Sequence, residues 1–119
     1  MEYNSNFSIF KDIVKNPKKQ LEKYLKQGKK VIGCFPLYTP DQLVYAAGMI
    51  PFGMWGAEIE VNRVKKYLPA YFCGIIQTNL ELGISGVYNG ISGVMITLLC
   101  DTLKCASQNW KYINSQIEM

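Results

Sequence analysis

The stretch from Cys73 to Cys100 places the strongest limit on how this chain can fold. Residues 93–99 form an apolar run that ends at Cys100, and a helical pattern begins at once with Asp101. An apolar run of this kind is typical of a parallel strand covered on both faces. The sequence therefore predicts a thiol at the carboxyl end of a strand, where open α/β sheets bind their ligands. Cys73 begins the helix that precedes this strand.

The rest of the chain shows helical and strand patterns in alternation. Asn16 is the expected N-cap of a helix that Gly28 ends, and Thr39 is the expected N-cap of the next one. The predicted helices cover residues 6–15, 17–27, 40–47, 71–83 and 102–112. The predicted strands cover residues 30–35, 49–55 and 94–99.

This order of elements predicts an α/β fold. We expect an N-terminal helical segment at residues 1–29, followed by an α/β domain at residues 30–119. The domain is a three-layer, mostly parallel sheet with flanking helices, half of a Rossmann-like or flavodoxin-like sheet. Half a sheet exposes an edge and an apolar face. We therefore expect either a fragment of a longer protein or a piece that completes itself on a partner.

Composition excludes several classes of function. The chain has no histidine, which removes the usual catalytic triads and most zinc sites. Residues 1–5 are polar and acidic, and no apolar run reaches the roughly 20 residues of a membrane span, so we predict neither a signal peptide nor a span. Four cysteines in a chain of this kind favour metal or redox chemistry, or burial, over disulfides. These features predict a cytoplasmic protein.

Lysines gather near the amino terminus. The net charge is +4, and eight of the thirteen basic residues precede Val31. Such a cluster can meet nucleic acid, an acidic partner or a coenzyme phosphate. The sequence favours a solvated face of an amphipathic helix, because no aromatic interleaving or base-reading motif accompanies the lysines.

The cysteines differ in what their positions predict. Cys73 and Cys100 lie at expected helix starts, where backbone amides favour the thiolate form that metals need. Their spacing alone leaves open whether they are ligands or two buried free thiols. Cys34 lies within a predicted strand and Cys105 more than one turn beyond Cys100, so both are expected to be core residues. No catalytic acid, base or nucleophile is assigned.

Several blocks of sequence resemble the 2-hydroxyacyl-CoA dehydratase family, to which benzoyl-CoA reductase subunits also belong. The match runs from about Lys19 to Lys111 and looks closest to the amino-terminal part of beta-type subunits. Its blocks are Gly33-Cys34-Phe35-Pro36-Leu37-Tyr38-Thr39-Pro40-Asp41-Gln42-Leu43, Ala46-Ala47-Gly48-Met49-Ile50-Pro51, Trp55-Gly56, Pro69-Ala70-Tyr71-Phe72-Cys73, Leu99-Cys100-Asp101-Thr102-Leu103-Lys104-Cys105 and Gln108-Asn109-Trp110-Lys111.

The resemblance implies a function and a cofactor. Members are heterodimeric lyases of amino-acid-fermenting anaerobes, and both of their subunits hold a [4Fe-4S] cluster. An ATP-hydrolysing iron–sulfur activator supplies one electron. The electron reduces the thioester carbonyl of an (R)-2-hydroxyacyl-CoA, held on the alpha-type subunit, to a ketyl radical anion. Loss of hydroxide and a β-proton then gives the (E)-2-enoyl-CoA. The family's cluster-ligand positions correspond here to Cys73 and Cys100.

The chain departs from this family in its length. Family subunits have a second α/β domain that supplies at least one further cysteine ligand, so residues 30–119 are expected to be truncated relative to them. The sequence therefore leaves three alternatives: a dehydratase component, a benzoyl-CoA-reductase-type subunit, or a non-catalytic structural or interaction domain. An unrelated small zinc or thiol protein is disfavoured, because histidine and a Cys-x-x-Cys motif are both absent from the sequence.

Overall fold

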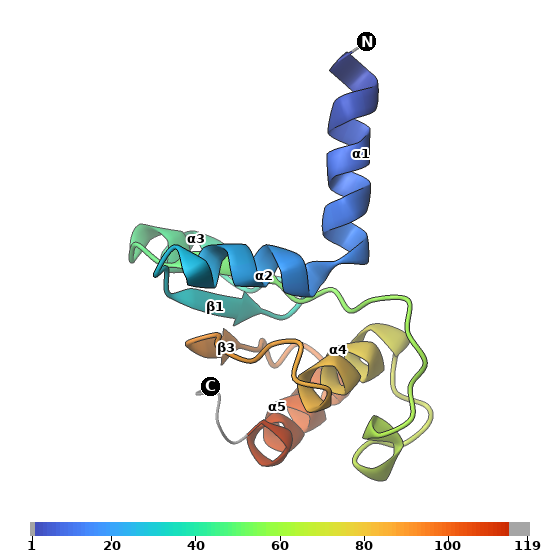
Figure 1. Cartoon of the computed structure of the whole chain (residues 1–119). Helices are drawn as coiled ribbons and strands as arrows, with labels where there is room; N and C mark the ends of the chain where they lie inside the picture. The colour runs from blue at the N-terminus through green and yellow to red at the C-terminus, as the bar shows by residue number, and fades with distance from the viewer. Residues whose placement is uncertain (1, 115–119) are drawn as a thin grey trace.

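The computed structural model describes the backbone of residues 2–114 and the side chains of residues 6–114. Helices and strands alternate after two N-terminal helices (Figure 1). The helices are α1 (Glu2–Lys15), α2 (Pro17–Lys26), α3 (Asp41–Ala46), α4 (Gly74–Ile84) and α5 (Asp101–Ile113), with a 3-10 turn at Val64–Lys66. The strands are β1 (Val31–Cys34), β2 (Ile50–Gly53) and β3 (Gly93–Met95). None of the described helices is long and apolar enough to cross a membrane.

The three strands form one parallel sheet in the order β2-β1-β3. Val31 of β1 is paired with Ile50 of β2, and Ile32 with Gly93 of β3. The next strand in sequence, β2, lies on one side of β1, and β3 lies on the other side. The strand order therefore reverses at β1. The α/β class and the parallel sheet are thus confirmed, and the reversal marks where such sheets bind ligands.

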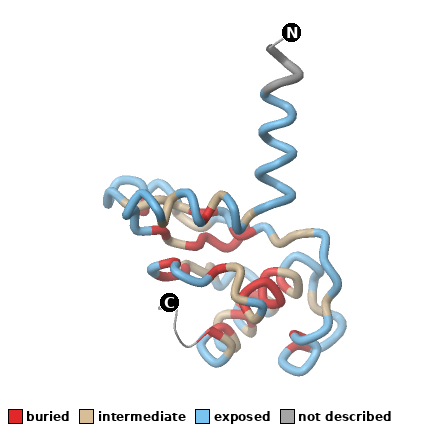
Figure 2. The backbone as a smooth tube through the Cα atoms, viewed as in Figure 1, coloured by how far each residue is buried: buried red, intermediate tan, exposed pale blue. Residues whose placement is uncertain are grey.

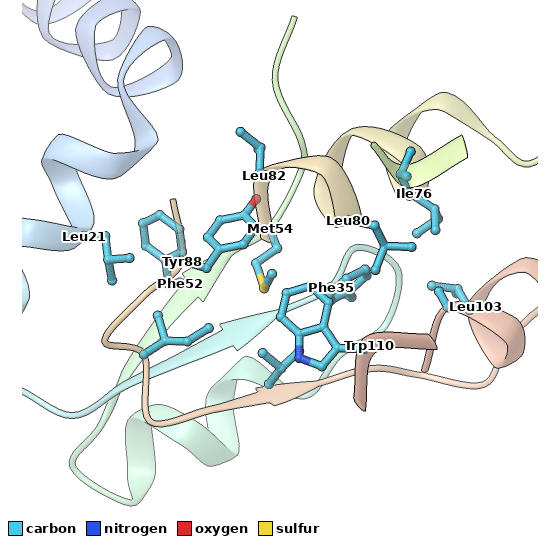
Figure 3. Packing of buried hydrophobic residues seen from close by; sticks show 14 of the residues in the cluster. Leu21, Phe35, Phe52, Met54, Ile76, Leu80, Leu82, Tyr88, Leu103 and Trp110 are labelled. Carbon is cyan, nitrogen blue, oxygen red and sulfur yellow. The ribbon is translucent and has the colours of Figure 1, made fainter. Parts of the chain in front are cut away.

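One face of the sheet carries the main core. Alternate positions of the strands point to it, and they pack with residues of α2, α4 and α5 (Figure 3). Gly33 is required there, because a Cβ atom would lie 2.4 Å from the sulfur of Met54. Cys34 and Val44 of α3 are buried outside this cluster. The largest buried members of the core are Leu21, Phe35, Met54, Leu80, Tyr88, Leu103 and Trp110.

The third strand is shorter than its sequence predicts. The run 94–99 was expected to be strand throughout, but β3 ends at Met95. The last pairing joins the amide of Phe35 to the carbonyl of Met95 at 3.0 Å. Beyond it the carbonyl of Phe35 accepts from the hydroxyl of Thr39, and Leu37 and Tyr38 leave the extended conformation with positive φ values, so β1 offers no further ladder. Cys100 therefore lies five residues after the strand, at the start of α5, rather than directly at the strand end.

Two further predictions need correction or refinement. Thr39 is not the N-cap of α3, because Pro40 holds that position and the Thr39 hydroxyl donates to the carbonyl of Phe35 at 2.6 Å. The reason is the turn before it, where Leu37 and Tyr38 have φ values of 73° and 59°. Asn16 does hold the N-cap position of α2, but it makes no side-chain cap bond.

The helix α1 stands away from the rest of the molecule (Figures 1 and 2). Its side chains from Asn6 onward are exposed, including the apolar Phe10 and Val14. A salt bridge of 2.9 Å between Asp12 and Lys19 joins it to α2. The lysines of α2 are exposed, as predicted for a solvated face, while Leu21 on the other side of the helix is buried.

Candidate functional site: two thiols in one hollow

Cys73 and Cys100 line the same small hollow, although 27 positions separate them in sequence. It measures about 80 Å³ and lies where β1 and β2 end and α4 and α5 begin. Both cysteines are exposed. The other lining residues are apolar: Pro36, Leu37, Trp55, Ile75, Ile76 and Leu103. The fold thus brings together the two cysteines that the sequence singled out.

Cys73 is the N-cap residue of α4. Its carbonyl accepts from the amides of Ile76 and Gln77, both at 3.1 Å. The side-chain amide of Gln77 reaches back and donates to the carbonyls of Phe72 at 2.6 Å and Ala70 at 3.1 Å. The turn that delivers Cys73 is therefore tied to the first turn of the helix.

Cys100 is the N-cap residue of α5, and its own sulfur serves as the cap. The amide of Leu103 donates to the Cys100 Sγ at 3.5 Å, and the amide of Lys104 donates to its carbonyl at 3.0 Å. The hydroxyl of Thr97, in the segment that leads to Cys100, donates to the carbonyl of Leu37 at 2.8 Å. The Cys100 segment is thereby attached to the turn after β1.

The electrostatics of the hollow favour an anionic group. Two helix amino termini, with their partial positive charge, meet at the two cysteines. No charged side chain lines the hollow among the described residues. Asp101 projects into solvent and pairs with Lys104 at 3.5 Å. The site therefore combines amide dipoles with apolar walls.

The two other cysteines lie elsewhere. Cys34 is buried as predicted, and its thiol donates weakly to the carbonyl of Ile32 at 3.7 Å. Burial raises the pKa of the Cys34 thiol, and the carboxylate of Asp41 adds to the increase. Cys105 is only half-buried, so its prediction as a core residue was too strong. The side-chain amide of Asn109 donates to its sulfur at 3.8 Å.

The segment after β1 forms hydrogen bonds within itself. The amide of Asp41 donates to the carbonyl of Thr39 at 2.8 Å, and that of Leu43 to the carbonyl of Pro40 at 3.1 Å. These amides are thus engaged within the segment. Its contribution to the site is the Leu37 side chain, which lines the hollow.

Sequence reasoning missed the part that Trp55 and Asn79 play in the architecture of the site. Trp55 lines the same hollow as Cys73. Asn79 is fully buried in α4, and its side chain bonds to the main chain on both sides of Trp55. The pair Trp55-Gly56 beyond a strand was a visible signal, but nothing in the local pattern of Asn79 pointed to a partner more than 20 positions away.

The donor atoms fit part of a metal-cluster site. Thiolates are the protein ligands of iron–sulfur clusters, and two thiols open into one apolar hollow here. Within residues 2–114, no group of three or more His, Cys, Asp or Glu lies close enough to hold a metal ion. The two cysteines can therefore supply two of the four ligands that a [4Fe-4S] cluster takes.

These features define an open parallel α/β domain with a paired-cysteine site beyond its strand ends. The sequence model of the family described as 2-hydroxyglutaryl-CoA dehydratase, D-component, matches residues 36–119. The chain belongs to this family.

Named relatives agree with the family assignment. The chain is 53% identical to the (R)-phenyllactyl-CoA dehydratase beta subunit of Clostridium sporogenes, over 94% of this chain and 30% of that protein. It is 46% identical to the (R)-2-hydroxyglutaryl-CoA dehydratase subunit beta of Acidaminococcus fermentans, over 86% and 27%. A benzoyl-CoA reductase subunit of Thauera aromatica is 33% identical over 70% and 22%. The chain thus spans about three tenths of the length of the dehydratase subunits it matches.

Proposed function

We propose that this chain is the amino-terminal part of the beta-type subunit of an iron–sulfur (R)-2-hydroxyacyl-CoA dehydratase. The observation that carries the proposal is the meeting of Cys73 and Cys100 in one hollow, in a chain whose relatives are named as dehydratase beta subunits. The reaction removes water from the hydroxyacyl thioester and yields the (E)-2-enoyl-CoA. The protein works in the cytoplasm of a fermenting anaerobe.

In this proposal Cys73 and Cys100 hold two irons of a [4Fe-4S] cluster. Such a cluster supplies one-electron transfer when it is bound. The amino termini of α4 and α5 stabilise the negative charge of the thiolates, and the other side chains that line the hollow are apolar. The remaining ligands come from outside the described residues. The relatives have more than twice as much further sequence to supply them.

The partners follow from the same proposal. An ATP-dependent iron–sulfur activator delivers one electron, and an alpha-type subunit holds the acyl-CoA. Reduction of the thioester carbonyl gives a ketyl radical anion on the substrate, which expels hydroxide. After loss of the β-proton the electron is returned. The part of this chain is to hold two thiolates at two helix amino termini, in an apolar hollow on the electron's route.

Anaerobic reconstitution with iron and sulfide tests the thiol pair. Iron content and the visible spectrum are measured on the chain itself and on Cys73→Ala and Cys100→Ala. Cys105→Ala is the matched control, because this thiol does not line the hollow. We expect iron to be retained by the unmodified chain and by the control, and lost from the other two. Retention of iron by either of those two variants would contradict the assignment.

A second function is favoured by exposed large side chains in the loop after β1 and in the segments that lead to the two cysteines. Tyr38, Tyr71 and Leu98 are 85%, 84% and 61% exposed. A surface of this kind indicates contact with more protein. If the unmodified chain binds no iron, we propose a structural or interaction domain of the same family. The likeness to the benzoyl-CoA reductase subunit of Thauera aromatica keeps a reductase-type subunit as a further alternative.

A further inference from the structure

Trp55 is held firmly although it is exposed. It is 62% exposed and lines the same hollow as Cys73. The peptide groups on both sides of it are bound to one side chain. The carbonyl of Met54 accepts from the Asn79 side-chain amide at 2.6 Å, and the amide of Gly56 donates to the Asn79 Oδ1 at 3.1 Å. Asn79 itself is 0% exposed.

Two glycines shape the turn around this indole. A Cβ atom on Gly53 would lie 3.2 Å from the Cδ1 of Trp55, so the absence of a side chain lets the indole fold back over β2. Gly56 has a φ of +80°, and a Cβ there would meet the hydroxyl of Thr78 at 2.2 Å. Only glycine allows the turn to approach α4 this closely.

The same helix carries both Asn79 and Cys73. Cys73 is the N-cap of α4, and Asn79 lies in the buried part of that helix. The Trp55 turn is therefore bonded to the element that positions the thiol. An exposed tryptophan on a flexible turn would need none of these features, and their combination indicates that its place in the lining of the hollow matters.

We propose that Trp55 forms a fixed wall of the metal site and contacts the bound group, with Asn79 as its positioning residue. This inference rests on the proposed function, in which Cys73 and Cys100 bind metal. The indole excludes water from the β2 side of the thiols. Apolar groups around a metal site control solvent access and the local dielectric, and outer groups that orient the ligands strengthen metal binding.

Cobalt(II) under anaerobic conditions is the probe, because thiolates bind it without sulfide and give a charge-transfer band. Affinity is measured on the 119-residue chain, on Trp55→Ala and on Gly53→Val. The valine pushes the indole aside, yet it suits an exposed strand position and leaves Asn79 intact. Gly74→Ala is the matched control, because a Cβ there meets nothing within 4 Å.

We expect cobalt(II) to bind about tenfold more weakly to Trp55→Ala and Gly53→Val. Gly74→Ala should bind as the unmodified chain does, and Trp55→Phe should restore part of the affinity. Urea midpoints of the variants separate this loss from unfolding. Equal affinity in all variants would overturn the inference and leave the proposed function standing. No binding by the unmodified chain would overturn the thiol pair and the inference together.

A metal-free measurement tests the position of the indole independently. Iodide quenches exposed tryptophans, so it reports Trp55 against the fully buried Trp110. Subtracting the signal of Trp55→Phe isolates Trp55. We expect Gly53→Val to speed the anisotropy decay of Trp55 and to increase its quenching, and Gly74→Ala to change neither. Unchanged quenching in Gly53→Val would show that the glycine does not set the indole, contrary to the inference.

Discussion

The helices α4 and α5 deliver one cysteine each to the same hollow, but they are attached to the fold in different ways. The helix α4 combines the buried apolar residues Ile76, Leu80 and Leu82 with buried polar side chains that bind the main chain of other segments. Asn79 binds the Met54–Gly56 turn, and Glu81 accepts from the amides of Asn62 at 3.1 Å and Val64 at 2.9 Å. The helix α5 is held by an apolar stripe in which Leu103, Ala106 and Trp110 are buried.

The difference teaches how each thiol is positioned. Hydrogen bonds are directional, so α4 fixes the turns around it as well as its own place. Apolar packing is not directional, so it holds α5 down without orienting the residues before it. The segment that leads to Cys100 therefore depends on its own contacts, the sulfur cap and the bond from Thr97 to Leu37. Cys73 is therefore positioned by a helix whose polar side chains are bonded inside the fold, and Cys100 by the hydrogen bonds of its own segment.

The largest loss of stability is expected from a substitution that removes apolar packing of α5. Trp110 is fully buried, and its ring meets that of Phe35 edge-on at 5.5 Å (Figure 3). We expect Trp110→Ala to lower the free energy of unfolding by about 3–5 kcal/mol, because it removes apolar contact and leaves a cavity. Urea unfolding followed by circular dichroism measures the loss. A loss below about 1 kcal/mol would show that apolar packing does not hold α5.

The next largest loss of stability is expected from a substitution that removes the hydrogen bonds of Asn79 in α4. In Asn79→Leu the carbonyl of Met54 and the amide of Gly56 lose their buried partner, as does the hydroxyl of Tyr88, which donates to Asn79 at 2.7 Å. We expect a loss of about 2–4 kcal/mol in the free energy of unfolding. Tyr88→Phe removes one bond of the three and should cost about 1 kcal/mol in urea unfolding. Equal losses in the two variants would contradict this assignment.

A smaller effect tests whether the two thiols are positioned independently of each other. Gln77→Ala removes both bonds to the turn before Cys73, at a cost of about 1 kcal/mol. We expect iodoacetamide to alkylate Cys73 at a changed rate in this variant and Cys100 at its original rate, as peptide mass spectrometry would measure. Gln108→Ala, an exposed position in α5, is the control. A parallel change at both thiols would mean that they are not positioned independently.

The smallest effect is expected in the dependence of the free energy of unfolding on pH. Burial raises the pKa of Tyr88 above its ordinary value of 10.0, so the folded state favours the neutral phenol. The stabilisation that the neutral Tyr88 phenol gives to the folded state is complete below pH 10. It is lost as the pH rises above 10, because the tyrosine of the unfolded chain then ionises first. Near pH ~10.5 the loss is somewhat under about 1 kcal/mol. Tyr88→Phe should remove this part of the alkaline slope in urea midpoints, whereas Tyr112→Phe, at 84% exposure, should not.

The local elements could be predicted because their causes are local. The spacing of apolar residues indicated α4, and capping residues indicated α3 and α5; Gly28, with a φ of +69°, follows the end of α2 as its sequence predicts. The end of β3 could not be predicted in this way. Residues 96–99 are largely apolar like those before them, and the turn of β1 after Phe35 deprives them of a ladder.

The sequence by itself determined the α/β class, the family and the two cysteines at helix starts, because periodicity, capping positions and motif blocks act over a few residues. The tertiary structure alone decided that Cys73 and Cys100 share one hollow and that Asn79 holds the turn of Trp55. The two cysteines are 27 positions apart, and the bonds of Asn79 to Met54 and Gly56 span 25 and 23 positions. These contacts exist because the strand order reverses at β1 and brings α4 and α5 together beyond the same strand ends, a result of packing that no local pattern contains.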